Sequence, residues 1–154
     1  MSAVSHPSAL SPVSPRITLD LAPGWDHVPG GRDLLRAECS GDPDRALTVS
    51  VQVQALDEPI DAVVRDVLAA DLDRVGAQQD PAFDVELAGQ DWTGHNVGWE
   101  GPGVAVHLVT GRETAAVRQV VVISGRSTGA TAEADYDAIQ AMVESLTLDW
   151  GGDS

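Results

Sequence analysis

The chain has 154 residues, enough for one domain with its own core, and 43% of them are hydrophobic, close to the globular average. With 24 acidic and 9 basic residues, the formal net charge is -15, which excludes a protein that binds nucleic acid or anionic lipid through a basic patch. A single cysteine excludes a fold held by internal disulfides, and no stretch reaches the length of a membrane-spanning helix.

The N-terminal segment is rich in serine and proline, so residues 1–15 are predicted to form a disordered tail. This segment lacks both the charged region and the apolar region of a signal peptide, which indicates a cytoplasmic protein. Residues 16–148 are expected to form a single α+β domain, followed by a frayed C-terminus at residues 149–154.

The first half of the domain is predicted to contain three strands. A short strand at residues 17–21 ends in a loop that includes Pro23-Gly24-Trp25 and continues to a turn at Pro29-Gly30-Gly31. A second strand at residues 34–39 leads through a hairpin turn into the third, at residues 47–56.

The third strand carries the clearest pattern in the chain. Apolar residues that include three valines alternate with four uncharged polar residues, which are Thr48, Ser50, Gln52 and Gln54. The outward face of this strand is therefore free of charge in a strongly acidic chain. Such a face is a candidate for a surface that another molecule covers.

The second half of the domain is predicted to contain two helices and more strands. Apolar residues at helical spacing indicate a helix from Pro59 to Gly76 and a last helix from Thr131 to Leu146. Between them, strands are predicted at residues 83–87, 92–99, 104–109 and 117–124. Strands and helices do not alternate regularly, so we expect an α+β fold, a mainly antiparallel sheet of about six strands with two principal helices packed on it.

No residues are assigned to catalysis. The run Gly125-Arg126-Ser127-Thr128-Gly129 matches the G-x-S-x-G motif, but no histidine follows Ser127, so the run is interpreted as a turn of small residues between a strand and a helix. The histidines and Cys39 lack the spacing of metal ligands, and no glycine-rich phosphate loop occurs, so no metal or cofactor is predicted. Asp71 falls within an apolar helical stripe, where it is expected either to reach water at the rim or to line a pocket.

The order of these elements resembles the PsbP-like fold. The likeness spans roughly residues 16–148 and includes the short strand that ends in Pro23-Gly24-Trp25, the polar hairpin and the strand LTVSVQVQAL. The fold is shared by the Ran-binding factors of the Mog type, the actinobacterial LpqN-like proteins and the Eag chaperones of type VI secretion. This resemblance implies a mostly non-enzymatic protein that holds a protein client on a sheet face.

The preferred hypothesis is a non-catalytic binding or adaptor module, chaperone-like and linked to bacterial secretion, with a protein partner. Its predicted partner-binding residues would lie on an uncharged sheet face: Thr48, Ser50, Gln52, Gln54, Trp99, His107, Val120 and Val122. One alternative is a small-molecule-binding protein or hydrolase with a pocket lined by Asp71, Trp92, Trp99 and His107. Another is a structural homo-oligomer, such as a homodimer, that buries the sheet face against itself.

Overall fold

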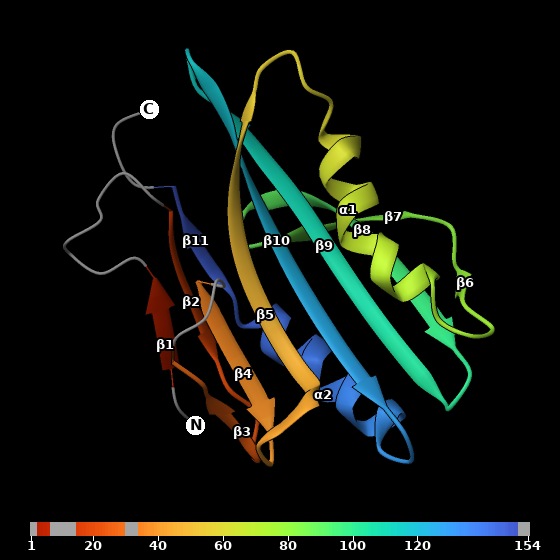
Figure 1. Cartoon of the computed structure of the whole chain (residues 1–154). Coiled ribbons are helices and arrows are strands. Elements are labelled where there is room, and N and C mark those ends of the chain that lie inside the picture. The colour runs from red at the N-terminus through yellow and green to blue at the C-terminus, as the bar shows by residue number, and fades with distance from the viewer. Residues whose placement is uncertain (1–2, 7–14, 30–33, 151–154) are drawn as a thin grey trace.

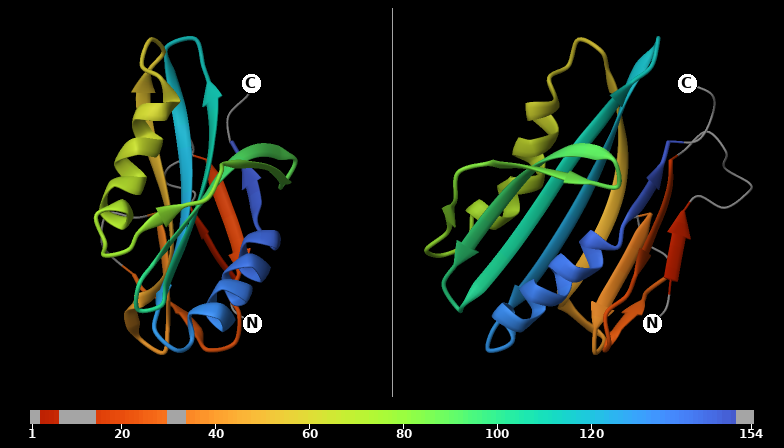
Figure 2. Two further views of the ribbon diagram at one scale, coloured as in Figure 1. Left: turned by 90° about the vertical axis from the view of Figure 1, so that its right-hand side faces the viewer. Right: turned by 180° about the vertical axis from the view of Figure 1, so that it is seen from behind.

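The computed structural model describes residues 3–6, 15–29 and 34–150. Its elements form three layers, with α1 (Ile60–Leu72) on one face of a large sheet and α2 (Ala132–Glu144) on the other (Figures 1 and 2). A small sheet lies beside α2 in the same layer, as the edge-on view in Figure 2 shows. Neither described helix is both long enough and apolar enough to cross a membrane.

The large sheet has eight strands, and every pairing within it is antiparallel. Across the sheet, the order is β3 (Trp25–His27), β4 (Leu35–Cys39), β5 (Asp42–Ala55), β10 (Val117–Thr128), β9 (Gly103–Glu113), β8 (Gln90–Trp99) and β6 (Gln78–Gln79), and β7 (Phe83–Leu87) also pairs with β8. The small sheet contains β1 (Ala3–His6), β2 (Arg16–Asp20) and β11 (Thr147–Asp149).

The main core lies between the large sheet and the layer formed by α2 and the small sheet. Alternation along β5 and β10 directs one set of side chains into this core. Its buried residues include Ile17, Leu19, Leu35, Leu47, Val49, Leu108, Val121, Ile123, Ile139 and Met142. A smaller core on the opposite face joins α1 to β9 and β10 through Val63, Val109, Val120 and Val122.

The predicted fold class is confirmed: the chain is α+β, with a mainly antiparallel sheet and two principal helices. The predicted number of about six strands is wrong, because the large sheet has eight and a second sheet has three. Three of the missed strands, β3, β6 and β11, contain two or three residues each, too few for alternation to show in the sequence. They form because longer neighbours offer them a pairing edge.

Several predictions about the ends of the chain concern residues that are only partly described. The segment predicted as a tail contains β1, which pairs with β2, while residues 1–2 and 7–14 lie outside the described residues. The predicted turn at residues 29–31 and the frayed end at residues 149–154 likewise fall partly outside them. The predicted domain boundaries therefore stay predictions.

The G-x-S-x-G run is not the turn that its glycines suggested. Strand β10 continues through it to Thr128, and Ser127 is fully buried. Its hydroxyl donates to Asp135 of α2 at 2.6 Å, and Asp135 also accepts two hydrogen bonds from Arg45, at 2.7 and 2.9 Å. This serine therefore helps to attach α2 to the sheet and has no access to a substrate.

Gly125 lets α2 approach the centre of the sheet. A Cβ atom at this position would lie 2.5 Å from Cγ2 of Ile139, which is a buried core residue on α2. Glycine weakens the interior of a strand, so its presence here reflects the close approach of the helix.

We expect Gly125→Ala to lower the free energy of unfolding by about 1–3 kcal/mol, because the added methyl group must displace Ile139. The measurement is chemical denaturation followed by circular dichroism. Gly98→Ala is the matched control, since a Cβ there would meet nothing closer than 3.7 Å. Equal losses for the two variants would contradict this account of Gly125.

Candidate functional site

The pairing register places all eight predicted partner-binding residues on one face of the large sheet. Gln52 lies opposite Val120 and Ser50 opposite Val122, and the alternation carries the same face across β9 and β8. Helix α1 covers the part of this face formed by β8, β9 and β10, whereas β5 has no helix over it (Figure 1). Five of the eight side chains are buried: Gln54, Trp99, His107, Val120 and Val122.

The part of the face left open is a strip on β5 formed by Thr48, Ser50 and Gln52, called here the β5 strip. Thr48 and Ser50 are half-buried and Gln52 is exposed. On the β4 side, Arg36 lies opposite Thr48 and pairs with Glu38 at 2.9 Å. The strip is thus neutral because its charged neighbour is already paired within the chain.

On the other side of the β5 strip, a buried network attaches the C-terminal end of α1 to the sheet. Asp71 is fully buried, and its Oδ2 lies 2.6 Å from Nε2 of His107 on β9. The other ring nitrogen of His107, Nδ1, lies 2.7 Å from Oγ of Ser124 on β10. Arg126 donates two hydrogen bonds to Oδ1 of Asp71, at 3.2 and 2.9 Å. With Asp71 ionised, Nε2 donates to the carboxylate, and in a neutral ring Nδ1 accepts the hydroxyl proton of Ser124.

The environment of Asp71 favours its charged form. Burial by itself raises the pKa of this carboxyl, but the hydrogen bond from His107 and the charge of Arg126 outweigh burial and hold the pKa below 3.8. The sequence expectation that Asp71 reaches water at the rim is therefore wrong. Local sequence pattern does not indicate the partners of Asp71, because they lie on two strands that are distant from α1 along the chain.

A serine, a histidine and a carboxylate in one hydrogen-bonded row are also the parts of a nucleophilic triad. Ser124, however, lies inside a strand paired on both sides, opposite Thr48 and His107, so the backbone N–H groups around it serve the sheet ladder. Donors for a developing oxyanion are therefore not available from that backbone. Asp71, His107 and Ser124 line neither the groove beside β6 and β8 nor the cavity between β7 and α2. The geometry accounts for the attachment of α1 and provides no substrate site.

The pocket predicted from Asp71, Trp92, Trp99 and His107 is not formed. Trp92 belongs to the main core on the opposite face of the sheet, where its indole N–H donates to the carbonyl of Leu87 at 3.0 Å. Trp99 packs near the far end of β8, in a cluster with Leu68. A small cavity of about 100 Å³ between β7 and α2 contains none of the four residues.

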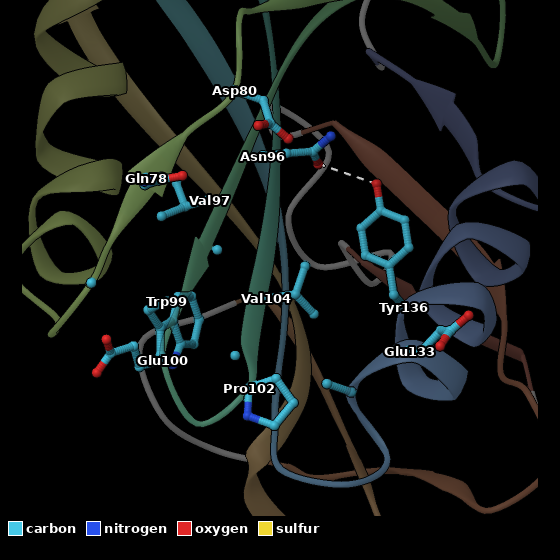
Figure 3. Close-up of a pocket in the computed structure, with 14 residues that line it drawn as sticks. Gln78, Asp80, Asn96, Val97, Trp99, Glu100, Pro102, Val104, Glu133 and Tyr136 are labelled. Carbon is cyan, nitrogen blue, oxygen red and sulfur yellow. Dashed lines mark hydrogen bonds between the residues drawn. The ribbon is translucent and has the colours of Figure 1, made fainter.

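The described residues also form a groove of about 750 Å³, called here the β8 groove (Figure 3). It lies where β6 and the β8–β9 turn approach the start of α2. The hydroxyl of Tyr136 on α2 donates to Oδ1 of Asn96 on β8 at 3.2 Å and links the two sides. The side chains that line it include Gln78, Asp80, Asn96, Trp99, Glu100, Pro102, Val104, Glu133 and Tyr136.

Apart from Trp99, the sequence did not indicate the β8 groove. Its residues come from three separate segments, 76–80, 96–104 and 132–136, and share no motif or spacing. No group of three His, Cys, Asp or Glu side chains in the described part of the chain could hold a metal ion.

Comparison with solved structures identifies the fold. The chain is similar to LpqN of Mycobacterium tuberculosis, described as involved in cell envelope biogenesis, with 14% identity, a TM-score of 0.69 and coverage of 96% of this chain and 91% of LpqN. It is also similar to cyanobacterial PsbP from Synechocystis, with 11% identity, a TM-score of 0.57 and coverage of 96% and 92%. The Ran-binding protein Mog1p of Saccharomyces cerevisiae matches with 13% identity, a TM-score of 0.53 and 95% coverage of both chains.

The chain therefore has the PsbP/Mog-like fold, as its sequence resemblance predicted. No protein-family model matches the sequence, and no curated protein matches it. At these identities, the likeness shows the fold alone.

Replacing the buried carboxylate by an amide tests the role of Asp71. We expect Asp71→Asn to lower the free energy of unfolding by about 1–3 kcal/mol, because the amide weakens the hydrogen bonds that the carboxylate accepts from His107 and Arg126. Urea denaturation measures the loss, and the exposed Asp73→Asn, just after the helix, is the control. A loss below about 1 kcal/mol would show that the network does not hold α1.

A second buried histidine is expected to make the free energy of unfolding depend on pH. His95 is buried, and neither ring nitrogen has a hydrogen-bond partner within the described residues. Burial lowers the pKa of His95 below 6.5, and His107 lowers it further, while Asp61 opposes the shift. A histidine whose pKa is lower in the folded chain favours unfolding once the pH falls below its unfolded value of 6.5.

We therefore expect the free energy of unfolding to fall as the pH drops below 6.5, and His95→Leu to reduce that fall. Urea denaturation above and below this pH measures the change in the free energy of unfolding. His27→Leu, at an exposed position, is the control. The lowered pKa values of Asp71 and Asp135 act in a more acidic range, below 3.8. An unchanged fall in His95→Leu would contradict the prediction.

Proposed function

We propose that this protein is a non-catalytic protein-binding module that acts as an adaptor or chaperone. The observation that carries the proposal is the β5 strip, a neutral part of the sheet face that α1 leaves open in a chain with a net charge of -15. The similarity to Mog1p, which is described as Ran-binding, supports a role in protein interaction. None of the three structural relatives is described by a reaction, which supports the non-catalytic part of the proposal.

The β5 strip suits an uncharged protein segment as its partner. Hydroxyl and amide groups can replace hydrogen bonds to water with hydrogen bonds to a partner. Burying them therefore costs less free energy than burying charged groups. The client that we propose is therefore a segment with few charges, in keeping with the likeness to secretion chaperones of the Eag type. Five of the eight predicted contact residues are buried with α1 in place: Gln54, Trp99, His107, Val120 and Val122. The contact residues that we propose are therefore Thr48, Ser50 and Gln52.

A photo-crosslinking residue at Gln52, compared with one at the exposed Glu86 of β7, tests this proposal in cells. We expect a cross-linked protein at Gln52 only, and binding of that purified protein weakened at least ~10-fold by Gln52→Arg, because an unpaired charge would be covered. Glu86→Arg should leave the affinity unchanged.

Equal cross-linking at both positions, or equal affinity of both arginine variants, would overturn the β5 strip as the binding surface. Cross-linking to a second copy of the chain would contradict the adaptor function and indicate a structural homo-oligomer.

A further inference from the structure

We propose that the β8 groove binds a basic segment of a partner protein, with an arginine or lysine side chain entering between Asp80, Glu100 and Glu133. The groove lies at the β6 end of the large sheet, and β10 separates the strands that line it from the β5 strip. The inference therefore stands whether or not the β5 strip binds a client.

The charges around the groove are not balanced within the chain. Asp80, Glu100 and Glu133 are exposed, and their side chains form no ion pair or hydrogen bond among the described residues. No arginine, lysine or histidine lines the groove. Five arginines of the described part are already paired with carboxylates: Arg36, Arg45, Arg74, Arg118 and Arg126. Of these, Arg74 lies against the ring of Trp99, beside the groove, and is paired with Asp71. Counter-charge for the groove is thus best supplied from outside.

The shape of the groove suits a long side chain rather than a bare ion. Its volume of about 750 Å³ exceeds what one cation needs, and Val104, Pro102 and the ring of Tyr136 provide apolar walls. An arginine or lysine lays its aliphatic stem along such walls while its charged end reaches carboxylates. Gly98 keeps the groove open, because the nearest atom to a Cβ there, the Gly103 carbonyl oxygen, would be 3.7 Å away.

Trp99 supplies a second and independent indication of a ligand. The side chain is only 8% exposed, it lines the groove, and its indole N–H has no acceptor within the described residues. A buried donor without an acceptor is costly, and a peptide carbonyl could satisfy it. The guanidinium of Arg74 also lies 4.4 Å from the centre of the Trp99 ring. A cation of the chain is thus already in contact with the ring, and the indole N–H is the group that is left for a ligand.

Amide NMR of the isotope-labelled full chain, at near-physiological ionic strength, tests the inference. The probes are acetyl-Gly-Arg-Gly-amide, the same peptide with glutamine in place of arginine, and agmatine, which has a guanidinium but no peptide. We expect the arginine peptide to shift the indole signal of Trp99 and the amide of Gly98, with the other two probes at least ~5-fold weaker.

Variants then separate the groove from the general acidity of the chain. Gly98→Leu should abolish binding by filling the groove, and Asp80→Asn with Glu133→Gln should weaken it at least ~5-fold. Asp84→Asn with Glu86→Gln, which removes the same charge from exposed positions on β7, should change nothing.

Several outcomes would overturn the inference. Equal weakening by the β7 variant would show attraction to the whole acidic surface. Equal binding of agmatine would indicate a small organic cation as the ligand, and equal binding of the glutamine peptide would remove the role of charge. Absence of shifts at Trp99 and Gly98 would show that the groove does not bind the peptide.

Discussion

The position of α1 depends on one buried carboxylate. Asp71 is fully enclosed, and an isolated charge in such a place would cost several kcal/mol, so the helix is held where His107 and Arg126 can compensate it. These partners lie on β9 and β10, and the small valine cluster between α1 and the same strands extends the attachment. The helix therefore covers one part of the sheet face and leaves β5 open. The location of the β5 strip follows from this ionic constraint.

The arginines explain the contrast between the two candidate surfaces. The chain has few cations, and the ion pairs that it forms lie around α1, α2 and the sheet. Arg36 and Arg126 are paired on either side of the β5 strip, which keeps the strip neutral. No arginine or histidine lines the β8 groove, where three carboxylates face solvent. One shortage of positive charge thus produces a neutral surface in one place and an acidic hollow in another.

Local pattern in the sequence predicted the elements that are long enough to show a period. The alternation of residues 47–56 identified the central part of β5 and its uncharged face, and helical spacing identified α1 and α2. Contacts between distant segments decided the rest. Nothing local showed that α1 would lie over Val120 and Val122, that Asp71 would meet His107, or that Asp80 and Glu133 would line one groove. Single-sequence pattern contains no information about those pairings.

The composition of the β5 strip has a physical reason that does not depend on the identity of its partner. A bare sheet face made of valine would favour aggregation, whereas a face of charged residues would resist being covered. Threonine, serine and glutamine avoid both problems, since water satisfies them when the face is bare and a partner satisfies them when it is covered. Val53, on the opposite side of the same strand, is 64% exposed, so this end of β5 is not protected by polar residues alone. Neutral polar residues at Thr48, Ser50 and Gln52 are therefore the composition expected of a surface that is alternately wet and covered.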